Sequence, residues 1–189
     1  MNAAFRRLAI EDVVHLQPRR FEDARGWFSE TYNDAGMEAA GIRFSPVQDN
    51  HSCSRRRGTL RGLHLQSAPF AQAKLVRVLS GAVLDVAVDL RPASRTFGQW
   101  VAQELSADAG DQLFVPRGFA HGFLTLEDDT EVLYKVDARY APDHALAIAW
   151  DDPDLAIDWP VAAADVILSE ADEAATSFAA WRAAQRLAA

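Results

Sequence analysis

The sequence predicts an all-β fold, built as a sandwich or a barrel. Between about residues 28 and 150, short β-like runs follow one another, and turn residues separate them. In the run 82–90, Leu and Val occupy the even positions from 84 to 90, while two of the alternate positions are Asp85 and Asp89. This period-two pattern is typical of a strand with one apolar and one more polar face. Because little helix is expected between the runs, a parallel sheet is disfavoured.

The strands can be placed one by one from this pattern. Ser80-Gly81 separates the first two, which is typical of a tight turn between paired strands. The expected strands are Lys74–Leu79, Ala82–Leu90, Trp100–Leu105, Gln112–Val115, His121–Leu126, Glu131–Val136 and Ala147–Trp150.

Helix is expected in two places. Asp34–Ala40 is a short candidate that Gly41 would end. Ser169–Leu187 is a longer, alanine-rich candidate, with Phe178 and Trp181 on one side. We expect a single domain over 1–189, with its core at about 25–150 and a C-terminal helical segment at about 169–187.

Composition favours a soluble cytoplasmic protein. Apolar residues make up 49% of the 189 residues, enough for a sizeable core. No apolar run approaches the roughly 20 residues of a membrane span, and residues 1–20 lack a signal-peptide core. The single cysteine, Cys53, allows no internal disulfide. No membrane partner is therefore expected.

The net charge of −8 disfavours a nucleic-acid partner, which would need a basic face to displace phosphate counterions. It does not exclude one small phosphorylated ligand, because a few placed cations suffice locally. The stretch from Arg55 to Arg77 is distinctly basic, whereas acidic residues gather toward the C-terminal end.

One motif has the spacing of the second cupin motif. It runs from Gly110 to Pro116, Gly118 and His121, with five, one and two residues between them. Proline and glycine at these offsets make a turn that would aim His121 into the mouth of a barrel.

The first cupin motif is only partly present. Gly58 and His64 are in place, but Gln66 stands where a metal-binding cupin has a second histidine, and Lys74 stands where it has a glutamate. A divalent ion prefers imidazole and carboxylate ligands, and two histidines are too few for a usual site. We therefore expect no metal and no other cofactor. The pocket should suit an anionic ligand and a developing oxyanion.

From about Phe21 to Trp159 the chain resembles the dTDP-4-dehydrorhamnose 3,5-epimerase family. The resemblance implies a double-stranded β-helix (cupin jelly roll) with short peripheral helices and a C-terminal helix. It also implies a homodimer, no metal requirement, and inversion of carbons 3 and 5 of a dTDP-linked 4-keto-6-deoxy sugar through an enolate. The matching segments are FEDARGWFSETYN, PVQDNHS, GTLRGLHLQ, AKLVRVLSGAVLDVAVDLR, TFGQW, LFVPRGFAHGF, VLYK and IAWDDPDLAIDWP.

The resemblance also implies roles for single residues. His64 stands at the general base, and its ordinary pKa of about 6.5 suits that role. Asp172 stands at the aspartate that pairs with the base, Tyr134 at the acid, and Lys74 at the group that stabilises the enolate oxygen. Tyr140 stands at the aromatic that stacks on thymine. Positions that hold the sugar, diphosphate or base correspond to Arg25, Glu30, Gln48, Asn50, Arg61 and His121.

Two positions depart from the family pattern. Ala171 replaces a lysine before the aspartate, and Ala145 replaces a glutamate. Both replaced residues contact ligand in the family, so these changes leave the exact nucleotide and sugar open. They do not affect the proposed acid and base.

Structural roles remain open for several of these residues. Ser169 and Asp172 have the spacing of a helix capping box. His64 and Tyr134 could be satisfied core residues, and Arg25 could pair with Glu22 or Asp23 on the surface.

Three other functions also remain open. They are an epimerase acting at carbon 3 or 5 only, a metal-dependent cupin, and a non-catalytic sugar-nucleotide-binding cupin. The same site residues serve one-carbon and two-carbon epimerisation, so the sequence does not separate these two.

Overall fold

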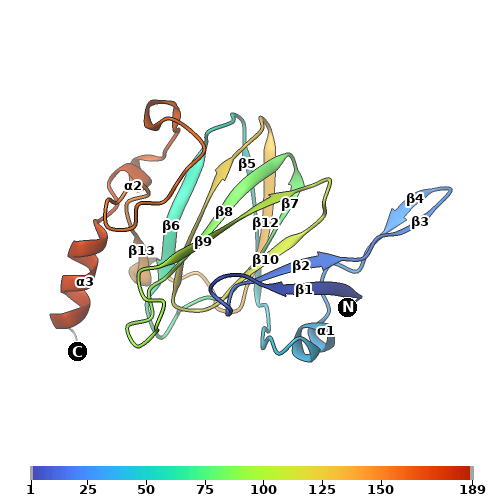
Figure 1. The fold of residues 1–189 in the computed structure, drawn as a ribbon, viewed down its shortest axis with the longest axis horizontal. Coiled ribbons are helices and arrows are strands. Elements are labelled where there is room, and N and C mark those ends of the chain that lie inside the picture. Colours follow the sequence, from blue (N-terminus) through green and yellow to red (C-terminus); the bar gives the residue numbers. More distant parts are fainter. Residues whose placement is uncertain (1, 188–189) are drawn as a thin grey trace.

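The computed structural model describes residues 2–187, and two antiparallel sheets dominate it (Figure 1). The six-stranded sheet has the order β1 (Ala3–Arg7), β2 (Val14–Pro18), β10 (Gln112–Val115), β7 (Lys74–Ser80), β12 (Thr130–Val136), β5 (Gln48–Ser54). The five-stranded sheet has the order β13 (Ala145–Ala147), β6 (Leu60–Gln66), β11 (Phe119–Thr125), β8 (Ala82–Asp89), β9 (Trp100–Ser106). This double-sheet architecture agrees with the predicted all-β jelly roll. The sheets also include β1 and β2, which precede the core expected at about 25–150.

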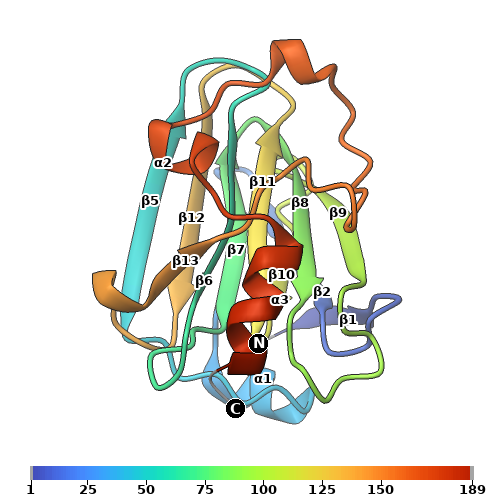
Figure 2. The same ribbon diagram turned by 90° about the vertical axis from the view of Figure 1, so that its left-hand side faces the viewer.

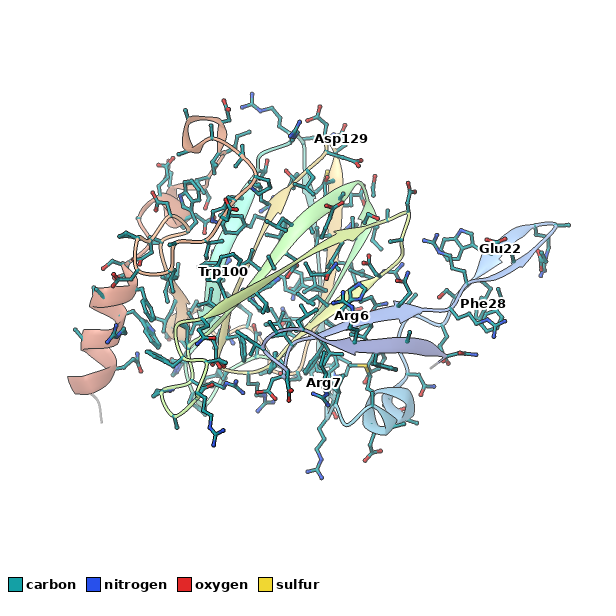
Figure 3. All side chains as sticks on the ribbon, viewed as in Figure 1. Arg6, Arg7, Glu22, Phe28, Trp100 and Asp129 are labelled. Carbon is teal, nitrogen blue, oxygen red and sulfur yellow. The ribbon has the colours of Figure 1, made fainter. Side chains whose placement is uncertain are left out.

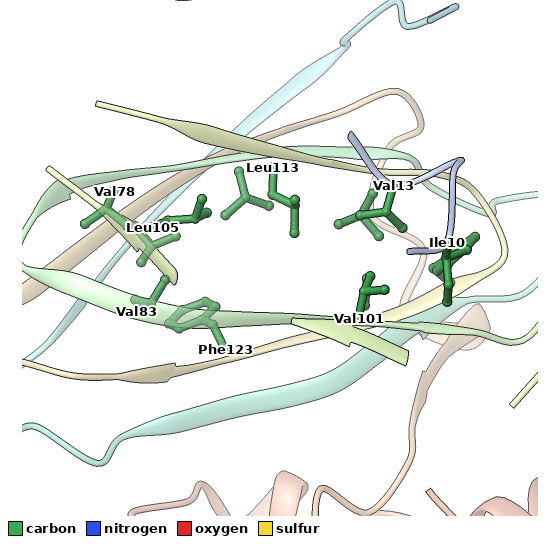
Figure 4. Packing of buried hydrophobic residues seen from close by; sticks show 13 residues of the cluster. Ile10, Val13, Val78, Val83, Val101, Leu105, Leu113 and Phe123 are labelled. Carbon is green, nitrogen blue, oxygen red and sulfur yellow. The ribbon is translucent and has the colours of Figure 1, made fainter. Parts of the chain in front are cut away.

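The two sheets face each other across an aliphatic core (Figure 4). Val78 and Leu113 come from the six-stranded sheet, and Val83, Leu105 and Phe123 come from the five-stranded sheet. Burying each such side chain contributes about 1.5–3 kcal/mol. This packing fixes the separation of the sheets, and a functional cavity lies where polar side chains replace the aliphatic ones.

The outer face of the five-stranded sheet is covered by the C-terminal segment, as Figures 1 and 2 show together. Val86 and Val88 pack there against a cluster that includes Ile148, Phe178 and Trp181. Both faces of β8 are therefore buried. The second face is more polar, as predicted, but its aspartates lie inside the protein and not toward solvent.

The sequence predicts that the turn at Ser80-Gly81 joins two paired strands, but the strands on either side of it do not pair. It connects the two sheets, since β7 pairs with β10 and β12 while β8 pairs with β11 and β9. Gly81 has a φ of +74°, and a Cβ there would lie 2.5 Å from Thr130 Oγ1. Glycine thus permits the chain to cross between sheets within two residues.

The helix expected over Ser169–Leu187 is divided into α2 (Glu170–Glu173) and α3 (Phe178–Leu187). The segment between them pairs with the chain after β13, where the Ala149 amide donates to the Thr176 carbonyl at 2.8 Å. The Phe178 amide donates to the Asp152 carboxylate at 2.8 Å. These tertiary bonds outweigh the helix propensity of the alanines. Phe178 and Trp181 are buried on one side of α3, as predicted.

The other elements lie at the edges of the sandwich. Helix α1 (Asp34–Ala39) agrees with prediction, and Met37 packs it under the six-stranded sheet. Strand β13 lies at Ala145–Ala147, earlier than the expected Ala147–Trp150. Ile148 continues the pairing with Leu63 of β6 and forms a bridge to Thr176. Single-turn helices are η1 (Pro142–His144) and η2 (Ala163–Asp165). No helix in the described part is long and apolar enough to cross a membrane.

A separate hairpin, β3 (Phe21–Asp23) and β4 (Gly26–Phe28), projects from the body of the protein (Figure 1). Glu22 and Phe28 lie clear of both sheets (Figure 3). All six residues of its strands are exposed.

Candidate active site

His64 lies on β6 and reaches the space between the sheets. The register between β6 and β11 shifts close to His64, at Gly62. Gly62 has a φ of +136°, and a Cβ there would lie 2.5 Å from the Gly122 Cα. Arg61 and His64 are three residues apart, which would place them on opposite faces of a regular strand. The irregularity brings both side chains to one cavity.

The His64 ring is oriented by Asp172 from α2. Its Nε2 donates to Asp172 Oδ1 at 2.5 Å, and the aspartate side chain is only 5% exposed. The Ser169 hydroxyl donates to the other carboxylate oxygen at 2.8 Å and accepts from the Asp172 amide at 3.2 Å. Burial alone would raise the pKa of Asp172, but the hydrogen bonds from His64 and Ser169 outweigh it and lower the pKa. Asp172 therefore takes part in the capping box with Ser169 and also pairs with His64.

Lys74, the first residue of β7, is buried beside His64. Its Nζ donates to the His64 carbonyl at 3.3 Å and lies 6.0 Å from the centre of the Tyr134 ring. Burial lowers the pKa of Lys74 to about 8, although the negative charge of Asp85 opposes the shift. An ammonium thus stands in a buried site, where its field is screened less than in open water.

His121 and Asp85 form a second imidazole–carboxylate pair. His121 Nε2 lies 2.9 Å and 3.0 Å from the two Asp85 oxygens, and Nδ1 lies 3.5 Å from Lys74 Nζ. Burial lowers the pKa of His121 despite the neighbouring Asp85. A neutral ring that donates to Asp85 through Nε2 presents the Nδ1 lone pair to Lys74.

Sequence reasoning did not assign a role to Asp85. Its signal was an acid inside a run of Val, Leu and Ala, and Asp85 is fully buried. A buried carboxylate needs a partner, and the register of β8 with β11 brings His121 within reach of it.

Tyr134 and Asn50 face each other on β12 and β5 and complete the wall on the six-stranded sheet. Burial raises the pKa of Tyr134, while the positive charge of Arg61 opposes that shift. Gln48 donates to Asn50 Oδ1 at 2.8 Å and accepts from the Tyr140 amide at 3.0 Å. These contacts join the strand wall to the loop that carries Tyr140.

Two adjoining cavities contain these side chains. The larger, of about 450 Å³, extends outward to Tyr140, Ala145 and Ala171. The smaller, of about 250 Å³, extends inward to Arg61, His121 and Asp172. Both are lined by Asn50, His64, Lys74, Tyr134 and Ala171. A ligand with two parts could occupy both at once, and His64, Lys74 and Tyr134 would lie at the junction.

Nine of the predicted site residues line these cavities, and two do not. Arg25 lies on the projecting hairpin, where its side chain is 89% exposed and pairs with Asp23. The surface pair considered from the sequence is therefore present. Glu30 follows the hairpin and accepts from Asn33 at 3.2 Å, away from either cavity. The cavity residues are Gln48, Asn50, Arg61, His64, Lys74, His121, Tyr134, Tyr140 and Asp172.

The side chains of the site offer few ligands for a metal ion. Among residues 2–187, no group of three or more His, Cys, Asp or Glu side chains is arranged to hold one. Gln66 uses its amide to hold backbone, donating to the Phe70 carbonyl at 2.7 Å and accepting from the Ala141 amide at 2.8 Å. The side chains at the junction instead suit proton transfer next to a stabilised negative charge.

Fold and cavity together define a cupin-type jelly roll with acid–base side chains gathered between its sheets. Residues 7–180 match the family described as dTDP-4-dehydrorhamnose 3,5-epimerase, and the chain belongs to that family. The Pseudomonas aeruginosa dTDP-4-dehydrorhamnose 3,5-epimerase is 53% identical to it over 174 residues, which cover 92% of this chain and 94% of that protein.

Two solved structures bear on the chemistry. A Legionella pneumophila 3,5-epimerase in complex with dTDP-4-keto-L-rhamnose is 42% identical and superposes with a TM-score of 0.88, covering 93% of this chain and 92% of that one. A 3′-monoepimerase from Streptomyces bikiniensis in complex with dTDP-quinovose is 35% identical, with a TM-score of 0.84 and coverage of 96% and 89%. One-carbon and two-carbon enzymes thus share this fold.

Proposed function

We propose that this chain is an isomerase that inverts carbons 3 and 5 of a dTDP-linked 4-keto-6-deoxy sugar by deprotonation and reprotonation. The observation that carries the proposal is the convergence of His64, Lys74 and Tyr134 at the junction of the two cavities. The identity to two-carbon epimerases favours this reaction over its one-carbon variant.

His64 is the proposed base. Because Nε2 donates to Asp172, the lone pair resides on Nδ1, which is free to accept a proton from a carbon next to the ketone. The ionised carboxylate of Asp172 then stabilises the imidazolium that forms. With the side chain of His64 46% exposed, substrate can reach the ring.

Lys74 is the proposed partner of the enolate oxygen. A proton next to a ketone is too weakly acidic for imidazole unless the oxygen is stabilised as negative charge develops. The ammonium of Lys74 is buried and can donate to that oxygen, while His121 Nδ1, 3.5 Å away, accepts from the same ammonium and helps to position it. No metal or other cofactor is required for this step.

Tyr134 is the proposed acid. It lies on β12, in the sheet opposite the one that carries His64, so it can return a proton to the other face of the sugar ring. Removal on one face and return on the other inverts the carbon. Repetition at the second carbon requires that the sugar ring shift within the same cavity, that His64 release its proton to solvent, and that Tyr134 take one up.

The larger cavity is the proposed nucleotide site. Tyr140 is 62% exposed at its rim and can stack on a base, while Gln48 and Asn50 present amides along one wall. Ala145 and Ala171 leave this wall small and uncharged. Arg61, in the inner cavity, supplies a positive charge for the sugar or diphosphate.

The functional unit is proposed to be a homodimer in the cytoplasm. The projecting hairpin exposes Phe21, Trp27 and Phe28 by 43%, 53% and 70%, which is costly for an isolated chain. Arg25 and Glu30 lie on or beside this hairpin and away from their own cavity. Docking of the hairpin on a second copy would cover the aromatics and bring these two residues to the partner's site.

Solvent exchange tests the function. In deuterated water, the protein and dTDP-4-keto-6-deoxyglucose should yield a product with deuterium at carbons 3 and 5, and His64→Ala should abolish this while the fold persists. Deuterium at one carbon would establish the one-carbon variant. Nucleotide binding without exchange would establish a non-catalytic protein, and activity lost on chelation would establish a metal-dependent one.

A further inference from the structure

A third cavity lies at the end of the six-stranded sheet next to α1. Its volume is about 490 Å³, larger than either active-site cavity, and it shares no lining residue with them. Its floor is apolar, with Ile42, Phe44 and Phe114 buried. Its rim is charged, and Figure 3 shows Arg7 at this end of the molecule, between β1 and α1.

The charges of this cavity do not balance. Four arginines and two aspartates line it. Asp12 pairs with Arg91 at 2.7 Å, and Asp137 pairs with Arg117 at 2.9 Å. Arg91 also binds Asp89, at 2.7 Å, so both of these arginines have carboxylate partners, and Arg7 and Arg43 remain. Within the described residues neither forms an ion pair, and Arg7 donates only to the Glu11 carbonyl, at 2.8 Å.

We propose that this cavity binds a phosphate-type anion through Arg7 and Arg43. A guanidinium offers several N–H donors in a planar fork that matches the oxygens of phosphate. The Nη1 bond to Glu11 uses one donor of Arg7 and leaves the others for a ligand. The charges of Arg91 and Arg117 are offset by their own aspartates, so Arg7 and Arg43 carry the proposal.

The charge of this cavity can be compared with that of the whole chain. The chain carries a net charge of −8, so a cavity lined by more arginines than aspartates differs from the overall charge of the protein. What distinguishes Arg7 and Arg43 is that both line one cavity with buried Ile42, Phe44 and Phe114 at its floor, so an anion held between them would be partly shielded from water.

The test measures phosphate binding with the active site filled. Pyrophosphate, and separately inorganic phosphate, is titrated by calorimetry into the protein saturated with dTDP. We expect one site per chain for pyrophosphate, weakened about tenfold or more in Arg43→Gln and Arg7→Gln, because each removes a charge-assisted contact. Arg95→Gln, which removes an exposed arginine outside this cavity, is the matched control and should bind as the wild type does.

Several outcomes would overturn the proposal. They are no binding to the dTDP-saturated wild type, equal binding by Arg43→Gln, or displacement of pyrophosphate by excess dTDP, which would place the anion in the active site. Arg43 is exposed, so Arg43→Gln should fold. If Arg7→Gln does not fold, binding by Arg43→Gln alone tests the proposal. Deuterium exchange without added phosphate should be unchanged in both variants, which separates this test from that of the proposed function.

Discussion

At the scale of the residue, the site depends on which groups are charged. Asp172 is nearly buried but keeps a lowered pKa, so it stays ionised across the neutral range. Because Asp172 accepts the hydrogen bond from His64 Nε2, the lone pair of the ring lies on Nδ1. An amide in its place could present an N–H to the ring, which would favour the wrong tautomer.

We therefore expect Asp172→Asn to slow exchange by about 10²- to 10⁴-fold, the usual contribution of positioned proton transfer. Deuterium incorporation at both carbons is the measurement. Ser169→Ala is the matched control, because it removes the second bond to the same carboxylate but leaves its charge. It should cost much less activity. Equal losses in the two variants would mean that Asp172 acts only as a helix cap.

We expect Lys74 to limit the activity at high pH. Its pKa is about 8, so the ammonium is present below that pH and is lost above it. If Lys74 holds the enolate oxygen, exchange at saturating substrate should fall as the pH rises through about 8. A pH profile of exchange checks this, and a rate that stays constant well above that pH would contradict it.

The variant Lys74→Gln separates the charge from the shape of this residue. It keeps a hydrogen-bond donor but has no titrating ammonium. Its activity should be low, and the decline near pH 8 should be absent. A decline that persists in Lys74→Gln would belong to another group.

At the scale of the element, β6 depends on one glycine. Arg61 and His64 share a cavity only because the strand is irregular at Gly62, where φ is +136°. A Cβ there would approach the backbone of β11 to 2.5 Å. A side chain at this position would therefore push β6 away from β11 and change the geometry of the site.

Gly62→Ala is expected to lower the free energy of unfolding by roughly 2–4 kcal/mol and to reduce exchange. Urea unfolding and deuterium incorporation are the two measurements. Gly26→Ala is the control, since Gly26 has a φ of +121° but a Cβ added there would have nothing within 4 Å. It shares the backbone strain and lacks the clash. Equal destabilisation would attribute the effect to strain alone.

The sequence predicted elements well where patterning is local. The strands from β7 to β12 follow from alternation, and Gly41 ends α1 as expected. The prediction from sequence failed where contacts with residues far along the chain determine the structure. The bonds of Thr176 and Phe178 that divide the C-terminal helix come from the chain near β13 and from Asp152, and no nearby residue signals them. Asp85 was likewise overlooked because its partner, His121, is 36 residues away.

At the scale of the whole molecule, the site is assembled from both sheets and the C-terminal segment. His64 and His121 come from one sheet, Lys74 and Tyr134 from the other, and Asp172 from α2. The resemblance predicted which residues take part, but residue spacing alone could not show that they converge. The proposed role of Arg25 depends on a second chain, and residue patterning does not show which chain's cavity Arg25 would reach.

A mixed dimer can show which chain Arg25 serves. If the hairpin completes the partner's site, Arg25→Ala and His64→Ala should each be nearly inactive alone. In a heterodimer, the site with an intact His64 would receive Arg25 from its partner, so an equal, randomly exchanged mixture should regain about a quarter of the wild-type activity. Deuterium exchange measures this after subunit mixing. If Arg25 acted within its own chain, no heterodimer would contain a complete site, and the mixture would remain as inactive as its parts.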